Sequence, residues 1–246
     1  MSLPVHLVLS LVGVAVGSTV RVEGDEAHHA VAVRRLRPGE QVVLTDGAGV
    51  WAAGEVAETG KRVMEVLIAT IETVPAPAPA VTVVQAIPKG ERGELAVETL
   101  TEIGAATIVP WAAARSVAVW RGDRAERSLN RWRATAREAA KQSRRAWFPA
   151  VAEMATTPAV VALVADATLA VVLHEEATAS LAGLDVPAEG EILVVVGPEG
   201  GLTDDEVAAF EAAGAVTVRL GAEVLRTSTA GVAAVAALLA RTPRWS

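Results

Sequence analysis

The hydrophobic pattern of the chain changes near residue 75. Before that point, short apolar runs are separated by turn residues such as Asp46-Gly47 and Thr59-Gly60, a pattern that predicts β-strands. The expected strands cover residues 5–9, 19–23, 40–45, 51–58 and 62–74. A short helix capped by Asp25 is expected over residues 25–36. Five short strands on so few residues favour a small closed β-barrel.

An alternating proline segment, residues 75–80, separates this part from the rest of the chain. Proline at every second position prevents a helix or a central strand and favours a stiff, extended connector. We therefore expect two domains, residues 1–74 and residues 81–246, joined by the linker 75–80.

Beyond the linker, β-branched runs alternate with segments of helical spacing. Strands are expected at residues 81–87, 107–111, 169–173, 192–196 and 216–220, and helices at 91–103, 123–143, 203–213 and 229–241. The first of these helices should end at Gly104, since glycine commonly follows the last helical residue. The second carries an apolar side made of Leu129, Trp132, Ala136 and Ala140. This alternation implies an α/β fold with a parallel sheet covered on both faces.

The amino-acid composition excludes several classes of protein and of functional site. Hydrophobic residues make up 52% of the chain, so we expect a substantial core rather than disorder. Cysteine is absent and only four histidines occur, so no metal site is expected. The apolar run 230–240 has about half the length of a membrane span. The apolar residues 3–20 lack the basic start of a signal peptide, and we therefore expect a soluble, cytoplasmic protein without a membrane partner.

Positive charge is concentrated in one segment of an acidic chain. The net charge is −7, yet residues 115–145 hold ten basic and three acidic residues, a local balance of +7. Nine of these ten basic residues are arginine, whose planar guanidinium suits bidentate contact with phosphate. The alternative is a solvated helix with i,i+4 ion pairs, for which few acidic partners are nearby. The segment favours nucleic-acid binding.

A glycine-rich loop follows the strand expected at residues 192–196. It reads Gly197-Pro198-Glu199-Gly200-Gly201-Leu202, and Thr203 with Glu206 then has the spacing of a capping box. Ligands of parallel sheets bind beyond the carboxyl ends of the strands, and glycine lets the backbone approach a ligand closely. The loop is a candidate ligand site, with a plain strand-to-helix turn as the alternative.

A second candidate loop follows the strand expected at residues 216–220. It runs from Gly221 to Thr227-Ser228-Thr229, whose hydroxyl groups are candidate caps for the next helix. Arg226 is a cation beside a helix start, where the helix dipole disfavours it, so we expect an anion or ligand there. Neither loop is a GxGxxG fingerprint or a P-loop, which counts against an ordinary dinucleotide or ATP fold. Lys89 and Arg92 form a weaker phosphate candidate.

Together these motifs resemble a known family. The loop 197–202, followed by Leu220-Gly221 and residues 224–227, resembles the cofactor end of the SPOUT-class RNA methyltransferases. More narrowly, it resembles the RsmE family, which methylates N3 of a uridine in 16S ribosomal RNA. Further motifs of that family follow in order: His28/His29 with residues 34–39, Lys89, residues 102–104, Pro110 with residues 115–117, Trp132, residues 138–140, Gln142-Ser143, Arg145 and Pro149. Ser228 stands where many members carry an acid, so no carboxylate acts as the base there.

The resemblance implies an N-terminal PUA-like barrel, a C-terminal SPOUT α/β domain with a trefoil knot, and a homodimer. It also implies S-adenosylmethionine (SAM) as the cofactor, held largely by backbone groups of three loops. The implied cofactor residues are Leu173, His174, Gly197, Pro198, Glu199, Gly200, Gly201, Leu220, Gly221, Val224, Leu225, Thr227 and Thr229.

Methylation of uracil at N3 requires loss of the N3 proton and stabilisation of the resulting negative charge. Glu199 and Glu138 are candidate bases, Arg226 and Arg145 are candidate cations, and we favour Glu199 with Arg226. Trp111, Trp120 and Trp147 are available to hold the flipped uracil, with core packing as the alternative. The expected RNA contacts are Arg34, Arg35, Arg37, Lys89, Arg92, Arg115, Arg144 and Arg145.

The expected partner is 16S rRNA, within the small ribosomal subunit. Two other functions stay open at this point. An enzyme of the same fold would methylate another RNA position or a ribose 2′-OH, because RNA contacts rather than cofactor loops set the substrate. A non-catalytic RNA-binding factor of ribosome assembly is the other alternative, although intact cofactor loops argue against it.

Overall fold

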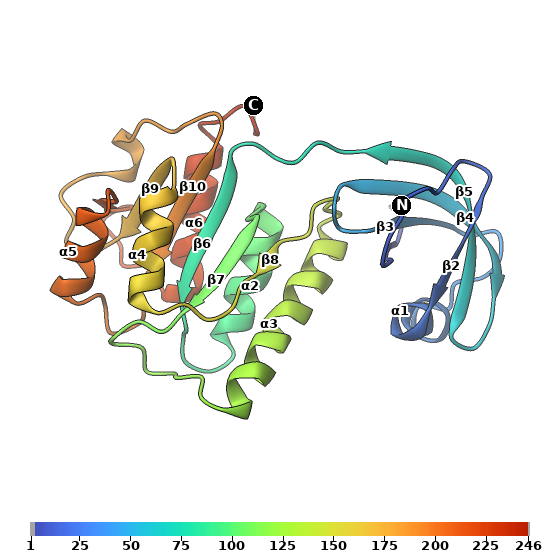
Figure 1. Cartoon of the computed structure of the whole chain (residues 1–246), viewed down its shortest axis with the longest axis horizontal. Coiled ribbons are helices and arrows are strands. Elements are labelled where there is room, and N and C mark those ends of the chain that lie inside the picture. The colour runs from blue at the N-terminus through green and yellow to red at the C-terminus, as the bar shows by residue number, and fades with distance from the viewer. Residues whose placement is uncertain (1–2, 246) are drawn as a thin grey trace. The chain divides into compact units, whose positions relative to one another are not determined.

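A computed structural model describes residues 3–245 of the chain, and this part divides into two compact units (Figure 1). One unit comprises the chain up to Ala76 together with Ala140–Phe148. The other comprises Pro77–Ala139 and the chain from Pro149 onward. The boundary between Ala76 and Pro77 falls inside the expected linker. Residues 140–148 belong to the first unit although they are more than 60 residues further along the chain.

The first unit is built on a curled five-stranded sheet. Its strands lie in the order β1-β3-β4-β5-β2, with β1 parallel to β3 and the other pairs antiparallel. They are β1 Val5–Leu7, β2 Thr19–Glu23, β3 Gln41–Thr45, β4 Val50–Thr59 and β5 Val63–Thr73. In residues 3–76 the edge strands β1 and β2 do not pair with each other, so the expectation of full closure is wrong. With three residues, β1 offers too few backbone groups to complete a barrel.

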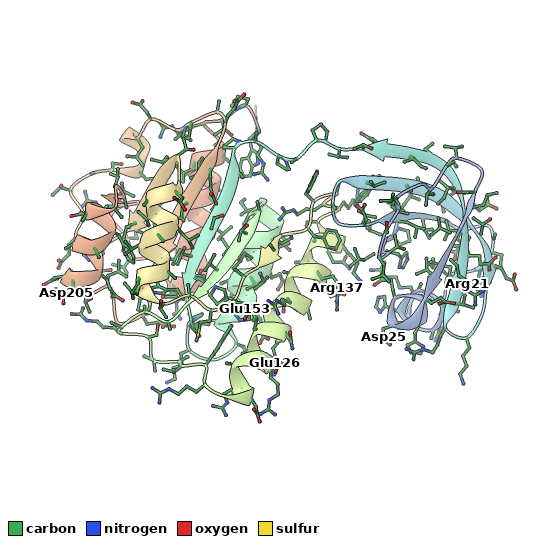
Figure 2. All side chains as sticks on the ribbon, in the orientation of Figure 1. Arg21, Asp25, Glu126, Arg137, Glu153 and Asp205 are labelled. Carbon is green, nitrogen blue, oxygen red and sulfur yellow. The ribbon has the colours of Figure 1, made fainter. Side chains whose placement is uncertain are left out.

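A short helical segment follows β2, as expected, but its cap differs. It consists of α1 Gly24–His28 and a π-helical turn, η1 His29–Val33. The prediction that Asp25 caps this helix is wrong, because Glu23 holds the N-cap position, and its side chain makes no capping hydrogen bond. Asp25, labelled in Figure 2, lies in the first turn. Its carboxylate accepts a hydrogen bond from the Arg62 guanidinium.

Three ionisable side chains are grouped in the first unit, with His6 and Lys141 buried and Glu26 partly buried. His6 Nδ1 lies 3.1 Å from Glu26 Oε1, and Lys141 Nζ donates to the two Glu26 oxygens at 3.2 and 3.0 Å. His6 is 1% exposed and Lys141 is 7% exposed. Burial by itself would raise the pKa of Glu26, but the hydrogen bond with His6 and the charge of Lys141 lower that pKa to about 2.

We expect the first unit to lose stability in acid through this cluster. Because the pKa of Glu26 is lowered from 4.5 to about 2, its contribution is complete above pH 4.5 and is lost as the pH falls toward 2. About 2 kcal/mol of unfolding free energy should disappear between pH 7 and pH 3. Denaturant titration of the wild type and of Glu26→Gln at both pH values measures this loss. An equal pH dependence in the two proteins would contradict the expectation.

The second unit contains a six-stranded sheet in which every pair of strands is parallel, so the predicted α/β fold is confirmed. The strand order is β11-β9-β10-β6-β7-β8. The strands are β6 Ala80–Ala86, β7 Thr107–Trp111, β8 Ala150–Val151, β9 Leu169–Leu173, β10 Glu191–Val196 and β11 Val216–Val218. The threading of the chain into a trefoil knot stays a prediction.

Helices cover both faces of this sheet (Figure 1). They are α2 Arg92–Ile103, α3 Asp123–Gln142, α4 Thr157–Asp166, α5 Asp204–Ala212 and α6 Thr227–Leu239, with a 3-10 turn, η2 Leu181–Gly183. One apolar cluster joins α2, α3 and α6 to the sheet, and a second joins α4 and α5 to it. The expected apolar side of α3 is buried, with Trp132 only 3% exposed. No helix in residues 3–245 is long and apolar enough to cross a membrane.

The predicted helix ends are confirmed at α2 and α5 and corrected at α6. Gly104 ends α2 with φ +105°, and Thr203 and Glu206 form a complete capping box on α5. The prediction that residues 227–229 cap α6 is wrong, because the helix begins at Thr227 and Arg226 holds the N-cap position without a side-chain cap. The helix begins two residues earlier than expected, which places the Thr227 and Ser228 side chains in the buried first turn.

Candidate functional site

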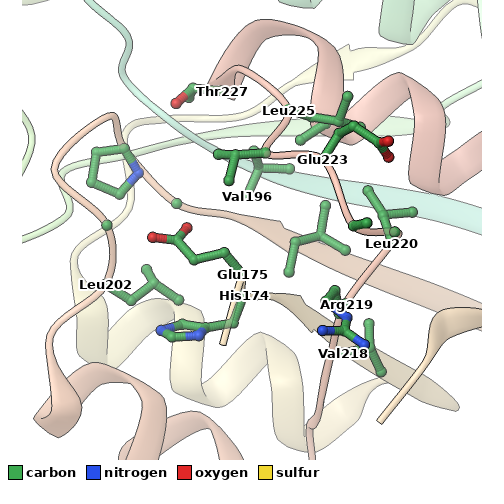
Figure 3. Close-up of a pocket in the computed structure, with 18 residues that line it drawn as sticks. His174, Glu175, Val196, Leu202, Val218, Arg219, Leu220, Glu223, Leu225 and Thr227 are labelled. Atoms are coloured by element: carbon green, nitrogen blue, oxygen red, sulfur yellow. The ribbon is translucent and has the colours of Figure 1, made fainter. Parts of the chain in front are cut away.

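A pocket opens in the second unit where β9, β10 and β11 end (Figure 3). The carboxyl ends of parallel strands meet at one edge of a sheet, which is where ligands bind in such folds. Its lining consists of Leu173, His174, Glu175, Val196, Gly197, Pro198, Gly201, Leu202, Val218, Arg219, Leu220, Gly221, Ala222, Glu223, Val224, Leu225, Thr227 and Ala230. The loops after three neighbouring strands therefore form one site.

Most of the predicted cofactor residues line this pocket. They are Leu173, His174, Gly197, Pro198, Gly201, Leu220, Gly221, Val224, Leu225 and Thr227. Glu199, Gly200 and Thr229 were predicted too and do not line it. Three charged lining residues were missed, Glu175, Arg219 and Glu223. Their signal in the sequence is only their position beside predicted loop residues.

The loop after β10 is held in place by its own turn and by Arg115. The Gly201 amide donates to the Pro198 carbonyl at 3.0 Å, and Gly201 has φ +72°, a left-handed conformation that favours glycine. Arg115 Nη1 donates to the Leu202 carbonyl at 3.0 Å. A Cβ atom on Gly200 would lie 2.9 Å from the Arg115 carbonyl oxygen. Gly200 thus allows the close approach that fixes this wall of the pocket.

Substitution of Gly200 by alanine should shift the loop and weaken cofactor binding by about tenfold. The new methyl group would meet backbone as well as side-chain atoms of Arg115, so the loop itself has to move, at about 1–3 kcal/mol. Gly183→Ala is a matched control, because nothing lies within 4 Å of its added Cβ. Titration calorimetry with SAM compares the two variants. Wild-type affinity in Gly200→Ala would contradict this role.

The chemistry of the lining fits SAM. Leu173, Val196, Leu202 and Leu225 offer apolar surface for an adenine ring. Glu175, Arg219 and Glu223 offer charged groups for the amino-acid end. A Cβ on Gly197 would lie 3.1 Å from the Leu202 side chain, so that glycine leaves room at the wall. In the described residues, no three His, Cys, Asp or Glu side chains are grouped to hold a metal ion.

The two favoured catalytic residues lie beside the pocket rather than in its lining. Arg226 is exposed and stands between the lining residues Leu225 and Thr227. Glu199 follows the lining residue Pro198, and its Oε1 accepts a hydrogen bond from the Lys89 amide at 3.1 Å. The loop after β10 therefore also contacts the segment between β6 and α2. Glu138, the other candidate base, lies on α3, and its Oε1 is 3.7 Å from Arg137 Nε.

The predicted RNA contacts fall in both units. Arg34, Arg35, Arg37, Arg144 and Arg145 belong to the first unit, and Lys89, Arg92 and Arg115 belong to the second. Arg115 is exposed yet holds the loop after β10, so it has a structural task of its own.

The charged face of α3 is partly paired. Arg131 Nη1 lies 3.2 Å from Glu94 Oε1, and Arg133 Nη2 lies 2.8 Å from Glu153 Oε1. These acidic partners come from outside the helix, so they are not the i,i+4 pairs that the alternative required. Glu126 and Arg137 mark the same helix in Figure 2.

The three tryptophans considered for uracil are packed within their units. Trp111 is fully buried against Phe210, and Trp120 packs edge-on against Trp132. The Trp147 indole donates to the Val74 carbonyl at 2.8 Å. The structure therefore gives core packing, the alternative, to Trp111 and Trp120, whereas Trp147 is half-buried and lies outside the apolar clusters.

Comparison with protein families places both parts of the chain. A family described as an RNA methyltransferase domain matches residues 75–239, and a family described as an RNA methyltransferase PUA domain matches residues 22–68. A parallel α/β unit with a pocket at its strand ends, joined to a PUA domain, thus defines an RNA methyltransferase.

Similarity to individual proteins identifies one family among the RNA methyltransferases. Ribosomal RNA small subunit methyltransferase E from Mycobacterium bovis is 48% identical over 93% of this chain and 89% of its own length. The protein of that name from Bacillus subtilis is 32% identical, over 89% of both chains. A crystal structure of the same enzyme from Neisseria gonorrhoeae, bound to SAM, has a TM-score of 0.85 at 28% identity, with 96% of each chain covered. The chain belongs to the ribosomal RNA small subunit methyltransferase E family.

Proposed function

We propose that this protein transfers a methyl group from SAM to N3 of a uridine in the 16S RNA of the small ribosomal subunit. The observation that carries the proposal is the pocket in which the loops after β9, β10 and β11 meet. A relative of the same fold has been solved with SAM bound, and the named relatives are small-subunit rRNA methyltransferases. The choice of N3 rests on the family resemblance of the loop motifs.

When bound, SAM supplies an electrophilic methyl group on a sulfonium, so the protein has to align that methyl with the acceptor nitrogen. Loop backbone and the apolar lining would hold the adenosine, which fixes the position of the methyl group. The buried Thr227 is the first residue of α6 and lines the pocket, so the start of that helix forms part of the pocket wall.

Glu199 and Arg226 would prepare the acceptor at the rim of the pocket. The Glu199 oxygen that does not accept the Lys89 amide would take the N3 proton. Arg226 would stabilise the negative charge that spreads onto the uracil oxygens as the proton leaves. In the described part of the chain, no hydrogen bond or ion pair occupies the Arg226 guanidinium. It is therefore available to the substrate.

The substrate RNA would be held by exposed arginines of both units, such as Arg34, Arg35 and Arg144 in the first and Arg92 in the second. We also propose that the protein acts in the cytoplasm as a homodimer. Val224, which lines the pocket and is 75% exposed, is a candidate for the dimer contact. Light scattering of the purified protein measures the oligomeric state.

Mass mapping of methylated nucleosides in 16S rRNA tests the proposed reaction. Cells that lack this protein should lack one N3-methyluridine, and expression of the wild-type chain should restore it. Loss of a ribose methylation, or of a methylation in another RNA, would contradict the proposed position. No change in any modification would contradict the enzymatic function.

A further inference from the structure

The pocket lining carries an uneven set of charges. Glu175 and Glu223 contribute two carboxylates, and Arg219 contributes the one guanidinium. All three side chains are exposed, and Figure 3 shows them around the pocket. Within residues 3–245, none of these charged groups has a hydrogen bond or an ion pair with another side chain. The three charged groups of the ionised lining therefore sum to one net negative charge.

These carboxylates come from two different loops. Glu175 follows β9, and its carboxylate points toward the loop after β10 (Figure 3). Glu223 follows β11, and its Oε2 would lie 3.6 Å from a Cβ on Gly221, so it stays close to the loop backbone. A ligand bound between the loops would interact electrostatically with both carboxylates. Arg219, at the end of β11, is the cation that opposes them.

The donor and the product of methyl transfer differ in charge at one atom. SAM carries a sulfonium and an ammonium against one carboxylate, so it has one net positive charge. S-adenosylhomocysteine (SAH) has a neutral thioether in place of the sulfonium and therefore has no net charge. The two ligands have otherwise the same groups. A protein that distinguishes them must respond to that charge or to the missing methyl group.

We propose that Glu175 and Glu223 make the pocket prefer the cationic donor SAM over its neutral product SAH. This inference rests on the proposed SAM-dependent function. Two unit charges separated by about 8 Å in a well-hydrated pocket interact with about 0.5 kcal/mol, which is about a twofold change in affinity for each carboxylate. Together the two carboxylates favour exchange of spent product for fresh donor.

The test is the ratio of the SAH and SAM dissociation constants, measured by titration calorimetry without RNA. Glu175→Gln and Glu223→Gln should each lower the preference for SAM by about two- to threefold, and the double variant by about fivefold. Arg219→Gln removes the opposing cation and should raise the preference by a similar factor. This opposite sign separates a charge effect from a general loss of binding. Glu211→Gln on α5 removes an exposed carboxylate outside the lining and should change nothing.

Salt gives a second readout. At about 1 M salt the screening length is about 3 Å, so the wild-type preference should shrink toward that of the double variant. A double variant that keeps the wild-type ratio would overturn the inference and leave the proposed function intact. If neither SAM nor SAH binds the wild-type protein, the proposed cofactor itself is wrong and the inference falls with it.

Discussion

Replacement of Arg226 by alanine should slow methyl transfer by about 100- to 1,000-fold while SAM still binds with wild-type affinity. The side chain is exposed, holds the N-cap position of α6 without capping it, and follows the lining residue Leu225. A cation there is locally unfavourable, because the helix dipole makes the start of a helix positive. Its backbone carbonyl accepts from the Ala230 amide at 2.9 Å whatever the side chain, so the helix start should survive the substitution.

Single-turnover methylation of small ribosomal subunits, with SAM affinity measured in parallel, separates chemistry from binding. Arg226→Lys is the matched control, since it keeps the charge but loses the planar pair of donors, and it should retain an intermediate rate. A stabilising cation predicts a slower chemical step with little change in KM for SAM. Near-normal turnover in Arg226→Ala would remove this residue from the mechanism.

The sequence predicts the elements of the second unit wherever the alternation of strand and helix is regular. The strands at 107–111 and 169–173 are found with the predicted bounds. Helix α4 was not predicted, because its apolar run after Pro158 is rich in alanine and valine and lacks a polar face. Strand β8 was not predicted either, since two residues carry no periodicity.

The residues of the site also fall into those that the sequence predicts and those that only the fold brings together. Glycine and proline mark the loops in the sequence, because the turns that they allow depend on residue type. Glu175 and Glu223 carry no such mark, and only the meeting of three strand ends places them at the pocket. The family resemblance supplied SAM and the site loops, which spacing alone left open.

The buried cluster of His6, Glu26 and Lys141 lay wholly outside prediction. Glu26 and Lys141 are 115 residues apart, and His6 and Glu26 are 20 apart, so no local pattern connects them. Glu26 was considered only as part of a short helix, and Lys141 only as one more charge of a basic helix. The structure instead buries Lys141 and pairs its ammonium with Glu26, which differs from the RNA contact predicted for its segment.

Replacement of Lys141 by methionine should destabilise the first unit by about 3–5 kcal/mol. The substitution keeps the length of the side chain but removes the ammonium that donates to both Glu26 oxygens. Glu26 would then stay partly buried as a carboxylate, with His6 as its remaining partner. Breaking a buried pair costs more than replacing it, because an unpaired charge remains out of water. The double variant Glu26→Gln/Lys141→Met should therefore recover much of the lost stability.

Denaturant unfolding at pH 7 measures the loss, and hydrogen exchange in β3 and β4 assigns it to the first unit. The cofactor pocket lies entirely in the second unit, so SAM affinity at low temperature should be unchanged in the same variant. Recovery in the double variant distinguishes an uncompensated carboxylate from poor packing of methionine, because both proteins carry the same methionine. A loss of less than about 1 kcal/mol in the single variant, the range of a surface pair, would show that this cluster is not the stabilising centre of the first unit.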